Sequence, residues 1–218
     1  MDLKELQSEL SDKNAVLVAV SKTHPPAKIL SIYEQGHRDF GENKVQELID
    51  KIDDLPDDIR WHMIGHLQSN KVKYIAPFIH LIHSLDRISL AKEINKHGKR
   101  NDRVIPVLLQ IKIAREDSKF GLAPEAIDEF MEKFQSRDYQ YVKIKGVMGM
   151  ATFTEKEEMI RSEFETLEVV FKKLKQNYFA EDEDFSIKSY GMSADYKIAL
   201  ETGSNMIRIG SLIFGERE

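Results

Sequence analysis

Short apolar runs alternate with segments of helical period along most of this chain. The first run, Ala15 to Ser21 (AVLVAVS), is apolar at nearly every position, as is typical of a strand buried on both faces. Pro25 and Pro26 then suit the start of a helix, which Gly36 can end. Because strands that alternate with helices build a parallel sheet, the sequence predicts an α/β fold.

The same alternation continues to the end of the chain. Further strand-like runs lie at residues 39–42, 61–64, 81–84, 104–113, 143–148, 185–189 and 206–209. Segments with a helical apolar stripe lie between them, at residues 45–52, 72–75, 88–98, 127–134 and 155–178. About eight strands result, which is the number in a TIM (β/α)8 barrel. The chain stops soon after the last run, and its amphipathic N-terminal segment is a candidate to take the place of the eighth helix.

Length and composition favour one domain over residues 1–218. A chain of 218 residues suits a single α/β barrel, and 41% hydrophobic with 32% charged residues supply a core and a hydrated exterior. Pro, Gly and Ser do not cluster into a linker. The acidic run Glu181–Asp184 is expected to be a solvated loop.

Charge and cysteine content argue against several classes of partner. The net charge is −5 and basic residues are spread along the chain, so nucleic acid is not an expected partner. The absence of cysteine excludes disulfides, thiolate nucleophiles and cysteine-based metal sites, and favours a reducing compartment. Because no signal peptide or membrane-spanning run is visible, we expect a cytoplasmic protein with no membrane partner.

Lys22 is the first candidate functional residue, because the functional face of a TIM barrel lies at the carboxyl ends of its strands. It directly follows the first apolar run. Partial desolvation there would lower the pKa of its amine and favour formation of a Schiff base. A plain surface lysine at a strand end is the competing interpretation.

Residues near the last two strands add a candidate phosphate site. Phosphate sites in this fold often lie in the loops after strands seven and eight, where Ser193 and Gly210-Ser211 combine hydroxyls with glycine. Taken singly, Ser193 could be an N-cap and Gly210 a tight turn. Taken together with Lys22, they favour phosphate binding.

Arg208 is a candidate partner for a cofactor ring. It lies two residues before Gly210, so both can share one face of a strand. A guanidinium cannot accept a proton, so it would keep a facing pyridine nitrogen unprotonated. The competing interpretation is a salt bridge to Glu201 or Glu216.

Several segments, in this order, resemble one known family over nearly the whole chain. They are VAVSKTHP (18–25), FGENKVQE (40–47), WHMIGHLQSNK (61–71), HSLD (83–86), DSKFGL (117–122), GVMGM (146–150), GMSADY (191–196) and GSNMIRIGSLIFGER (203–217). The family is that of the pyridoxal phosphate (PLP) homeostasis proteins, also called proline synthetase co-transcribed homologues. So many ordered matches are far more specific than one short motif.

The resemblance implies a fold and a set of cofactor-binding residues. The fold is the alanine racemase N-terminal barrel, or PLP fold type III, without the β-domain of the racemase. Lys22 matches the PLP-bearing lysine and Arg208 the arginine that faces the pyridine nitrogen. The other matches are Ser193, Gly210 and Ser211 at the phosphate, Asn43 beside the cofactor, and Ser84, Met148 and Met192 in pocket segments.

Two departures from the family pattern stand out. The segment before the first strand looks shorter than usual, which affects how the barrel closes there. Lys112 replaces a common asparagine in the fifth strand, where it could bind anions, shift the local charge or point outward.

The resemblance implies a PLP-binding protein of intracellular PLP homeostasis. It would store, buffer or deliver the cofactor, held as a Schiff base on Lys22, without substrate turnover. PLP-dependent apoenzymes would be transient partners, and the protein a monomer or weak dimer.

Two alternative functions stay open. A PLP-dependent amino-acid racemase needs an acid or base on each face of the substrate α-carbon. Lys22 supplies one face, whereas Tyr190 and Tyr196 are better explained as packing or capping residues. The second alternative is a phosphate-binding barrel that does not use PLP.

No metal site is predicted. His62 and His66 have i, i+4 spacing, but the strand-to-loop context, with Gly65 between them, does not place them on one helix face. His80, His83 and Glu42 form no recognisable ligand set.

Overall fold

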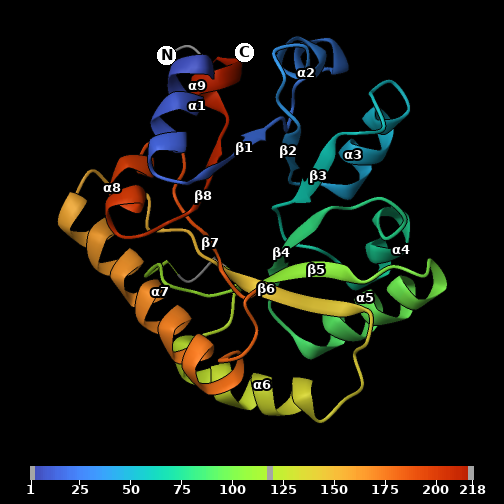
Figure 1. Ribbon diagram of the computed structural model, residues 1–218, viewed down its shortest axis with the longest axis vertical. Coiled ribbons are helices and arrows are strands. Elements are labelled where there is room, and N and C mark those ends of the chain that lie inside the picture. Colours follow the sequence, from blue (N-terminus) through green and yellow to red (C-terminus); the bar gives the residue numbers. More distant parts are fainter. Residues whose placement is uncertain (1–2, 117–119, 216–218) are drawn as a thin grey trace.

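The computed structural model describes residues 3–116 and 120–215 of the chain. Eight parallel strands close into a barrel in which each strand pairs with the next along the chain and β8 pairs with β1 (Figure 1). The strands are β1 (Val16–Val20), β2 (Asp39–Glu42), β3 (Arg60–Met63), β4 (Leu81–Leu85), β5 (Ile105–Gln110), β6 (Val142–Met148), β7 (Ile187–Ser189) and β8 (Met206–Ile209). The predicted TIM barrel is confirmed.

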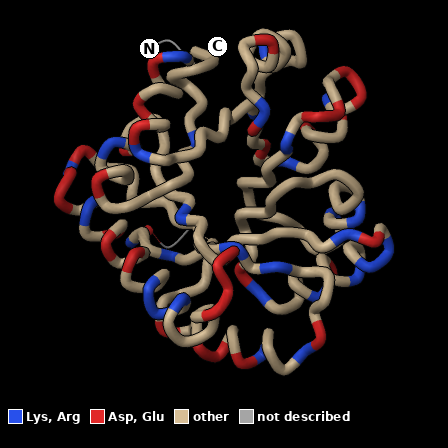
Figure 2. The backbone as a smooth tube through the Cα atoms, in the orientation of Figure 1, with Lys and Arg blue, Asp and Glu red and all other residues tan. Residues whose placement is uncertain are grey.

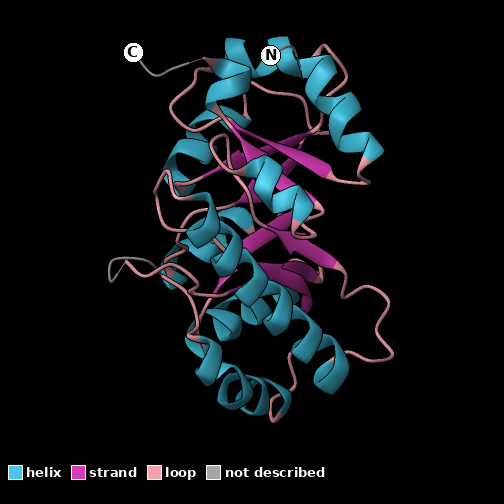
Figure 3. Cartoon of the chain, turned by 90° about the vertical axis from the view of Figure 1, so that its left-hand side faces the viewer, coloured by secondary structure: helices cyan, strands magenta, loops and turns pink. Residues whose placement is uncertain are grey.

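Helices cover the outside of the barrel, so the strands lie within a layer of helices (Figure 3). The α-helices are α1 (Leu3–Asp12), α2 (Pro26–Tyr33), α3 (Val45–Ile52), α4 (Val72–Ile75), α5 (Ile88–Arg100), α6 (Ile127–Gln135), α7 (Glu157–Tyr178), α8 (Tyr196–Glu201) and α9 (Ser211–Phe214). Short 3-10 turns, η1 (Ser69–Lys71) and η2 (Pro124–Ala126), precede α4 and α6.

Helix α1 takes the place of a full eighth outer helix. Its residues Leu3, Leu6 and Leu10 recur at helical spacing and are buried in the core. The Tyr196 hydroxyl of α8 donates to Glu9 Oε2 of α1 at 3.2 Å. Helix α9, which follows β8, is only four residues long and lies beside α1 (Figure 1). The amphipathic N-terminal segment therefore completes the outer layer.

Strand alternation sorts side chains between the lumen of the barrel and the layer under the helices. An apolar cluster of residues from five strands can form only through the lumen, and it contains Val18, Leu81, Leu108, Met148 and Met206. Their strand neighbours, such as Leu17 and Val147, belong to the larger cluster under the helices. Polar residues at the same inward positions therefore face the lumen too.

One strand contains an extra residue that only a glycine makes possible. Val107 of β5 pairs with Ile144, but Leu108 pairs with Gly146, so Lys145 is bulged out of the ladder. Gly146 has a φ of +153°, and a Cβ there would overlap the carbonyl oxygen of Ile187 on β7. The absence of a side chain at this position lets β7 pair with β6.

Two strand boundaries differ from the sequence prediction by more than one residue. The fifth strand ends at Gln110 rather than at residue 113, because Ile111 makes only an isolated bridge to Leu122 before the chain turns away. Lys112 lies in that loop, partly exposed, and its backbone N–H donates to the Leu122 carbonyl at 2.8 Å. The seventh strand starts at Ile187, since Phe185 packs into the helical layer instead.

Charged residues of both signs are mixed along the outer helices and loops (Figure 2). The acidic run predicted as a loop is a loop, and Asp184 forms ion pairs with Lys143 at 2.6 Å and Lys145 at 3.0 Å. Among the helices of residues 3–116 and 120–215, none is long and apolar enough to cross a membrane.

The bulge in β6 makes a testable prediction. Gly146→Ala should destabilise the fold by more than about 4 kcal/mol, because the new methyl group collides with rigid backbone. Gly36→Ala is the matched control, since Gly36 also has positive φ, at +93°, but nothing lies within 4 Å of its Cβ position. Gly36→Ala should lower the free energy of unfolding by only about 1 to 2 kcal/mol. Urea unfolding of both variants measures the difference, and equal costs would contradict the steric account.

Candidate functional site at the mouth of the barrel

Lys22 lies at the mouth of the barrel, two residues after the end of β1. Val18 faces the lumen, and alternation along the strand carries the inward side through Val20 to Lys22. The residue is partly exposed. The structure thus places Lys22 where the sequence predicted a cofactor lysine, and its chemical role stays a prediction.

The loop that carries Lys22 is held on both sides by α3. Thr23 has a φ of +69°, a left-handed conformation that β-branched residues rarely adopt. Its N–H donates to the Glu47 carboxylate. Lys51, one turn later in α3, donates to the carbonyl oxygen of Ser21 at 3.1 Å. These contacts keep the strained backbone in place.

A buried ion pair beneath this loop was not predicted from the sequence. Glu42 is fully buried, and its Oε1 accepts hydrogen bonds from Ser21 Oγ at 2.7 Å and Lys51 Nζ at 3.0 Å. Burial raises the pKa of Glu42, although both partners oppose the shift. Lys51 also pairs with Glu47 at 2.7 Å. The i, i+4 spacing of Glu47 and Lys51 looks like an exposed helix pair, so the burial of Lys51 is not visible in the sequence.

The two segments predicted to bind phosphate meet after β7 and β8. The Gly210 N–H donates to Ser193 Oγ at 3.4 Å. Gly210 also lies close to β1, because a Cβ there would be 3.2 Å from the Val20 carbonyl oxygen. Ser193 is not the N-cap of α8, whose N-cap is Asp195, so the capping interpretation is wrong. Ser211 is exposed at the first position of α9.

The same two loops offer backbone donors. Within the described residues, the N–H groups of Ser193, Ala194, Ser211 and Leu212 make no hydrogen bond. Successive free N–H groups of this kind form concave binding sites for anions. The first turn requires Gly191, which has a φ of +99° and no room for a side chain.

Arg208 is buried in the lumen with an exposed fraction of 3%. Its Nη1 donates to the carbonyl oxygen and the hydroxyl of Ser189 at 2.7 and 2.6 Å, and its Nη2 donates to the Gly149 carbonyl at 2.9 Å. Burial lowers its pKa to about 10. Glu201 pairs with Arg161 instead, so the predicted alternative of a salt bridge to Glu201 is wrong, and Glu216 lies outside the described residues.

Several buried polar atoms of the described residues have no hydrogen-bond partner. Among them are Ser84 Oγ on β4 and Gln110 Oε1 at the end of β5, both near the mouth. Ile82 and Leu85 both lie under the helices although they are three residues apart, so the irregular stretch between them turns Ser84 towards the lumen. Unpaired buried polar atoms are expected where a polar ligand completes the site.

The remaining predicted residues lie at different depths. Asn43 follows β2, and the pairing of Val20 with Gly41 places it beside Lys22 on the neighbouring strand. Met148 is fully buried in the lumen cluster, and Met192 is partly exposed in the loop that holds Ser193. Met148 thus forms apolar filling below the mouth.

The two tyrosines considered as second acid/base groups are engaged elsewhere. Tyr190 is fully buried, and its hydroxyl donates to Glu168 Oε1 at 2.6 Å. Burial, followed by this hydrogen bond, raises its pKa. The Tyr196 hydroxyl donates to Glu9. Both tyrosines therefore act in packing, as the sequence interpretation favoured.

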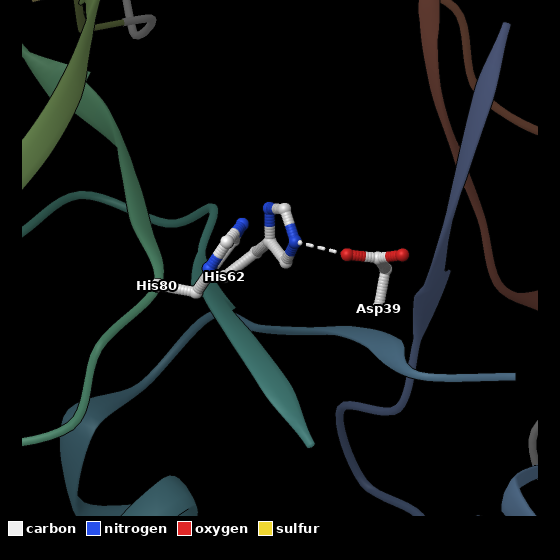
Figure 4. A group of neighbouring side chains, drawn as sticks. All are labelled: Asp39, His62 and His80. Atoms are coloured by element: carbon white, nitrogen blue, oxygen red, sulfur yellow. Dashed lines mark hydrogen bonds and ion pairs between the residues drawn. The ribbon is translucent and has the colours of Figure 1, made fainter. Parts of the chain in front are cut away.

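A group of potential metal ligands lies at the opposite end of the barrel. The ligand atoms of Asp39, His62 and His80 all lie within 4.8 Å of one another (Figure 4). Arg60 already pairs with Asp39, with Nε 2.7 Å from Oδ1, and His62 Nε2 lies 3.1 Å from the same oxygen. Burial would raise the pKa of Asp39, but hydrogen bonds from Arg60 and His62 outweigh it and hold the pKa well below its usual range. The guanidinium of Arg60 thus supplies the positive charge beside Asp39.

Residues 2–218 match the family model described as the alanine racemase N-terminal domain. The fold and the mouth residues therefore define a barrel of this class. The chain belongs to the pyridoxal phosphate homeostasis protein family. It is 40% identical to the member from Aquifex aeolicus over 205 residues, which cover 94% of this chain and 88% of that protein. It is 34% identical to the member from Escherichia coli K12 over 215 residues, 95% of this chain and 88% of that one.

Solved structures show the same relationship. PipY from Synechococcus elongatus PCC7942, solved with PLP bound, has a TM-score of 0.86 and 32% identity, with 98% of each chain covered. Alanine racemase from Clostridium difficile 630 has a TM-score of 0.75 at 16% identity, which shows a shared fold alone. This chain covers 57% of that racemase.

The buried pair beneath the Lys22 loop makes a second prediction. Lys51→Met should destabilise the fold by about 3 to 5 kcal/mol, because it leaves Glu42 buried without its cation. Since burial already raises the pKa of Glu42, the loss should shrink as the pH falls and that carboxylate takes up a proton.

Two further variants control this experiment. Lys133→Met removes an exposed i, i+4 pair with Glu129 and should cost less than about 0.5 kcal/mol. Lys51→Met combined with Glu42→Gln should recover part of the stability. Urea unfolding at pH 7 and pH 4.5 measures all variants, and a loss independent of pH would contradict the role given to Glu42.

Proposed function

We propose that this chain binds PLP and takes part in intracellular PLP homeostasis by storing, buffering or delivering the cofactor. The observation that carries the proposal is the convergence of Lys22, the Ser193–Gly210 pair and Arg208 on one barrel mouth. The relatives named above are PLP homeostasis proteins, and PipY was solved with PLP bound.

Each residue of the mouth has a distinct role in this proposal. Lys22 would hold the cofactor through its amine, and bound PLP would supply an aldehyde that can condense with that amine with loss of one water. Ser193, Gly210 and Ser211 hold the phosphate together with the free N–H groups of the two loops. Arg208 would donate to the pyridine nitrogen. Asn43 and Ser84 would offer polar groups to the cofactor, and Met148 and Met192 would offer apolar surface.

The protein atoms left over at the mouth fit such a ligand. Of the five N–H groups of the Arg208 guanidinium, three donate to described protein atoms. The Ser84 hydroxyl is buried and unpaired. These groups match a ligand that carries a ring nitrogen acceptor and several oxygens.

Binding without turnover agrees best with this site. Both candidate tyrosines are engaged in other hydrogen bonds, so neither of them is available as the acid or base opposite Lys22. We further propose that PLP-dependent apoenzymes are transient partners and that the protein is a monomer or weak dimer.

PLP binding is tested by absorbance. Addition of PLP should give a visible imine band that borohydride bleaches, with the reduced phosphopyridoxyl group found by mass spectrometry on the peptide containing Lys22. Lys22→Ala should lose the band, whereas Lys28→Ala, an exposed lysine of α2, should keep it. A wild-type protein that stays colourless with PLP would reject the proposal and favour a phosphate-binding barrel.

Racemase activity is the second candidate, because the barrel fold is shared with alanine racemase. We expect no interconversion above the rate of free PLP when the PLP-loaded protein is incubated with single enantiomers of amino acids. Chiral chromatography measures the products. Interconversion at enzymatic rates, about 1 per second or faster, would make the protein an enzyme.

A further inference from the structure

A series of hydrogen bonds, here called the relay, crosses the lumen from Arg208 to the opposite end of the barrel. Its members come from β8, β7, β4, β3 and β2. The links are Arg208 Nη1 to Ser189 Oγ at 2.6 Å, Ser189 Oγ to His83 Nδ1 at 3.1 Å, His83 Nε2 to His62 Nδ1 at 2.9 Å, and His62 Nε2 to Asp39 Oδ1 at 3.1 Å.

The middle of the relay is closed to solvent. Ser189 and His83 are 0% exposed and His62 is 1% exposed. Every ring nitrogen of the two histidines is used, which satisfies buried polar groups whose loss of partners would be costly. Such an arrangement is stable only if each contact has one donor and one acceptor.

Asp39 fixes the direction of hydrogen-bond donation at one end of the relay. As an ionised carboxylate it can only accept, so His62 Nε2 carries the proton. A neutral His62 then has an acceptor at Nδ1. Nδ1 of His62 can accept this hydrogen bond only if Nε2 of His83 carries a proton.

The other end gives the same direction. Burial is the main cause that holds the pKa of His83 far below its usual value, and the charge of Arg208 acts in the same direction, so His83 is neutral and its Nδ1 accepts from the Ser189 hydroxyl. Ser189 Oγ is then free to accept from Arg208, which can only donate. If the hydrogen bonds ran the other way, His83 Nδ1 would donate to Ser189 Oγ. The Ser189 hydroxyl proton would then have no acceptor among the described atoms.

We propose that Asp39, His62, His83 and Ser189 are positioning residues that fix the Arg208 guanidinium for cofactor binding. Because the Ser189 proton is committed to His83, its oxygen acts purely as an acceptor for Arg208. Ser189 and the Gly149 carbonyl then hold Nη1 and Nη2 in place. The inference rests on the proposed function, which places Arg208 against the PLP ring.

The relay also connects the mouth with the far end of the barrel. Asp39 is the first residue of β2, and with Arg60 and Arg38 it lines a polar cavity of about 410 Å³. His80 lies next to His62, with ring centroids 5.3 Å apart, but it is not a link of the relay. His80 therefore serves as a matched control for the group in Figure 4.

The direction of the relay can be measured in wild-type protein without PLP. Long-range ¹H–¹⁵N NMR spectra should show both His62 and His83 as neutral rings protonated at Nε2. Assignment uses His62→Gln and His83→Gln. A proton on Nδ1 of either ring at pH 7 would overturn the proposal.

The positioning role is tested by PLP affinity and by the ring nitrogen itself. His83→Phe and Asp39→Asn should each weaken PLP binding about fivefold to tenfold and shift the ¹⁵N resonance of PLP labelled at the pyridine nitrogen. A merely structural role would lower the melting temperature and leave that resonance unchanged. His80→Gln and His97→Gln, the latter a buried histidine of α5, should stay within twofold of wild type.

A double-mutant cycle separates the relay from independent effects. Once His83 is replaced, Asp39→Asn should weaken PLP binding by less than twofold further, because the connection is already cut. If the fold-losses of PLP affinity of the two single variants multiplied in the double variant, the proposal would be overturned. A loss of PLP affinity in His80→Gln as large as that in His83→Phe would also overturn it. If wild-type protein fails to bind PLP, the proposed function fails, whereas normal wild-type binding with unchanged variants rejects the relay alone.

Discussion

The charge of Arg208 inside the barrel is the constraint on which the site depends. An isolated buried charge costs several kcal/mol unless surrounding groups accept its hydrogen bonds. Apolar residues such as Val18 and Met148 share the lumen with these polar groups, so Arg208 depends on the acceptors nearest to it. Two carbonyl oxygens and the Ser189 hydroxyl supply them, and the polar path from Ser189 to Asp39 follows from satisfying each of these groups in turn. The remaining N–H groups of the Arg208 guanidinium donate to none of the described residues.

Much of the architecture could be predicted from the sequence because it follows from periodicity. The apolar run at β1 and the glycines near β7 and β8 indicate buried strands and tight loops, and these locate Lys22, Ser193 and Gly210 at one end of the barrel. Contacts across the lumen could not be predicted in this way, because they join residues on different strands, 106 positions apart for His83 and Ser189. A polar residue at an inward strand position, as at His62, is the signal that remains visible in the sequence.

The shared barrel says little by itself about chemistry. Alanine racemase has the same fold at 16% identity, yet this chain covers only 57% of it. What distinguishes the two functions is the presence of a second proton-transfer group opposite the lysine. In this chain, Glu168 and Glu9 accept hydrogen bonds from the hydroxyls of Tyr190 and Tyr196, so the first phenol holds α7 to the barrel and the second holds α8 to α1.

Helix α3 gives the Lys22 loop a property that matters for a protein that binds and releases a small molecule. One ammonium group, that of Lys51, contacts the ends of β1 and β2 and the first turn of α3. The backbone around Lys22 is therefore ordered before any ligand arrives, and its conformational entropy has been lost during folding rather than on binding. A ligand that meets Lys22 would find this loop already in place, which lowers the entropic cost of binding there.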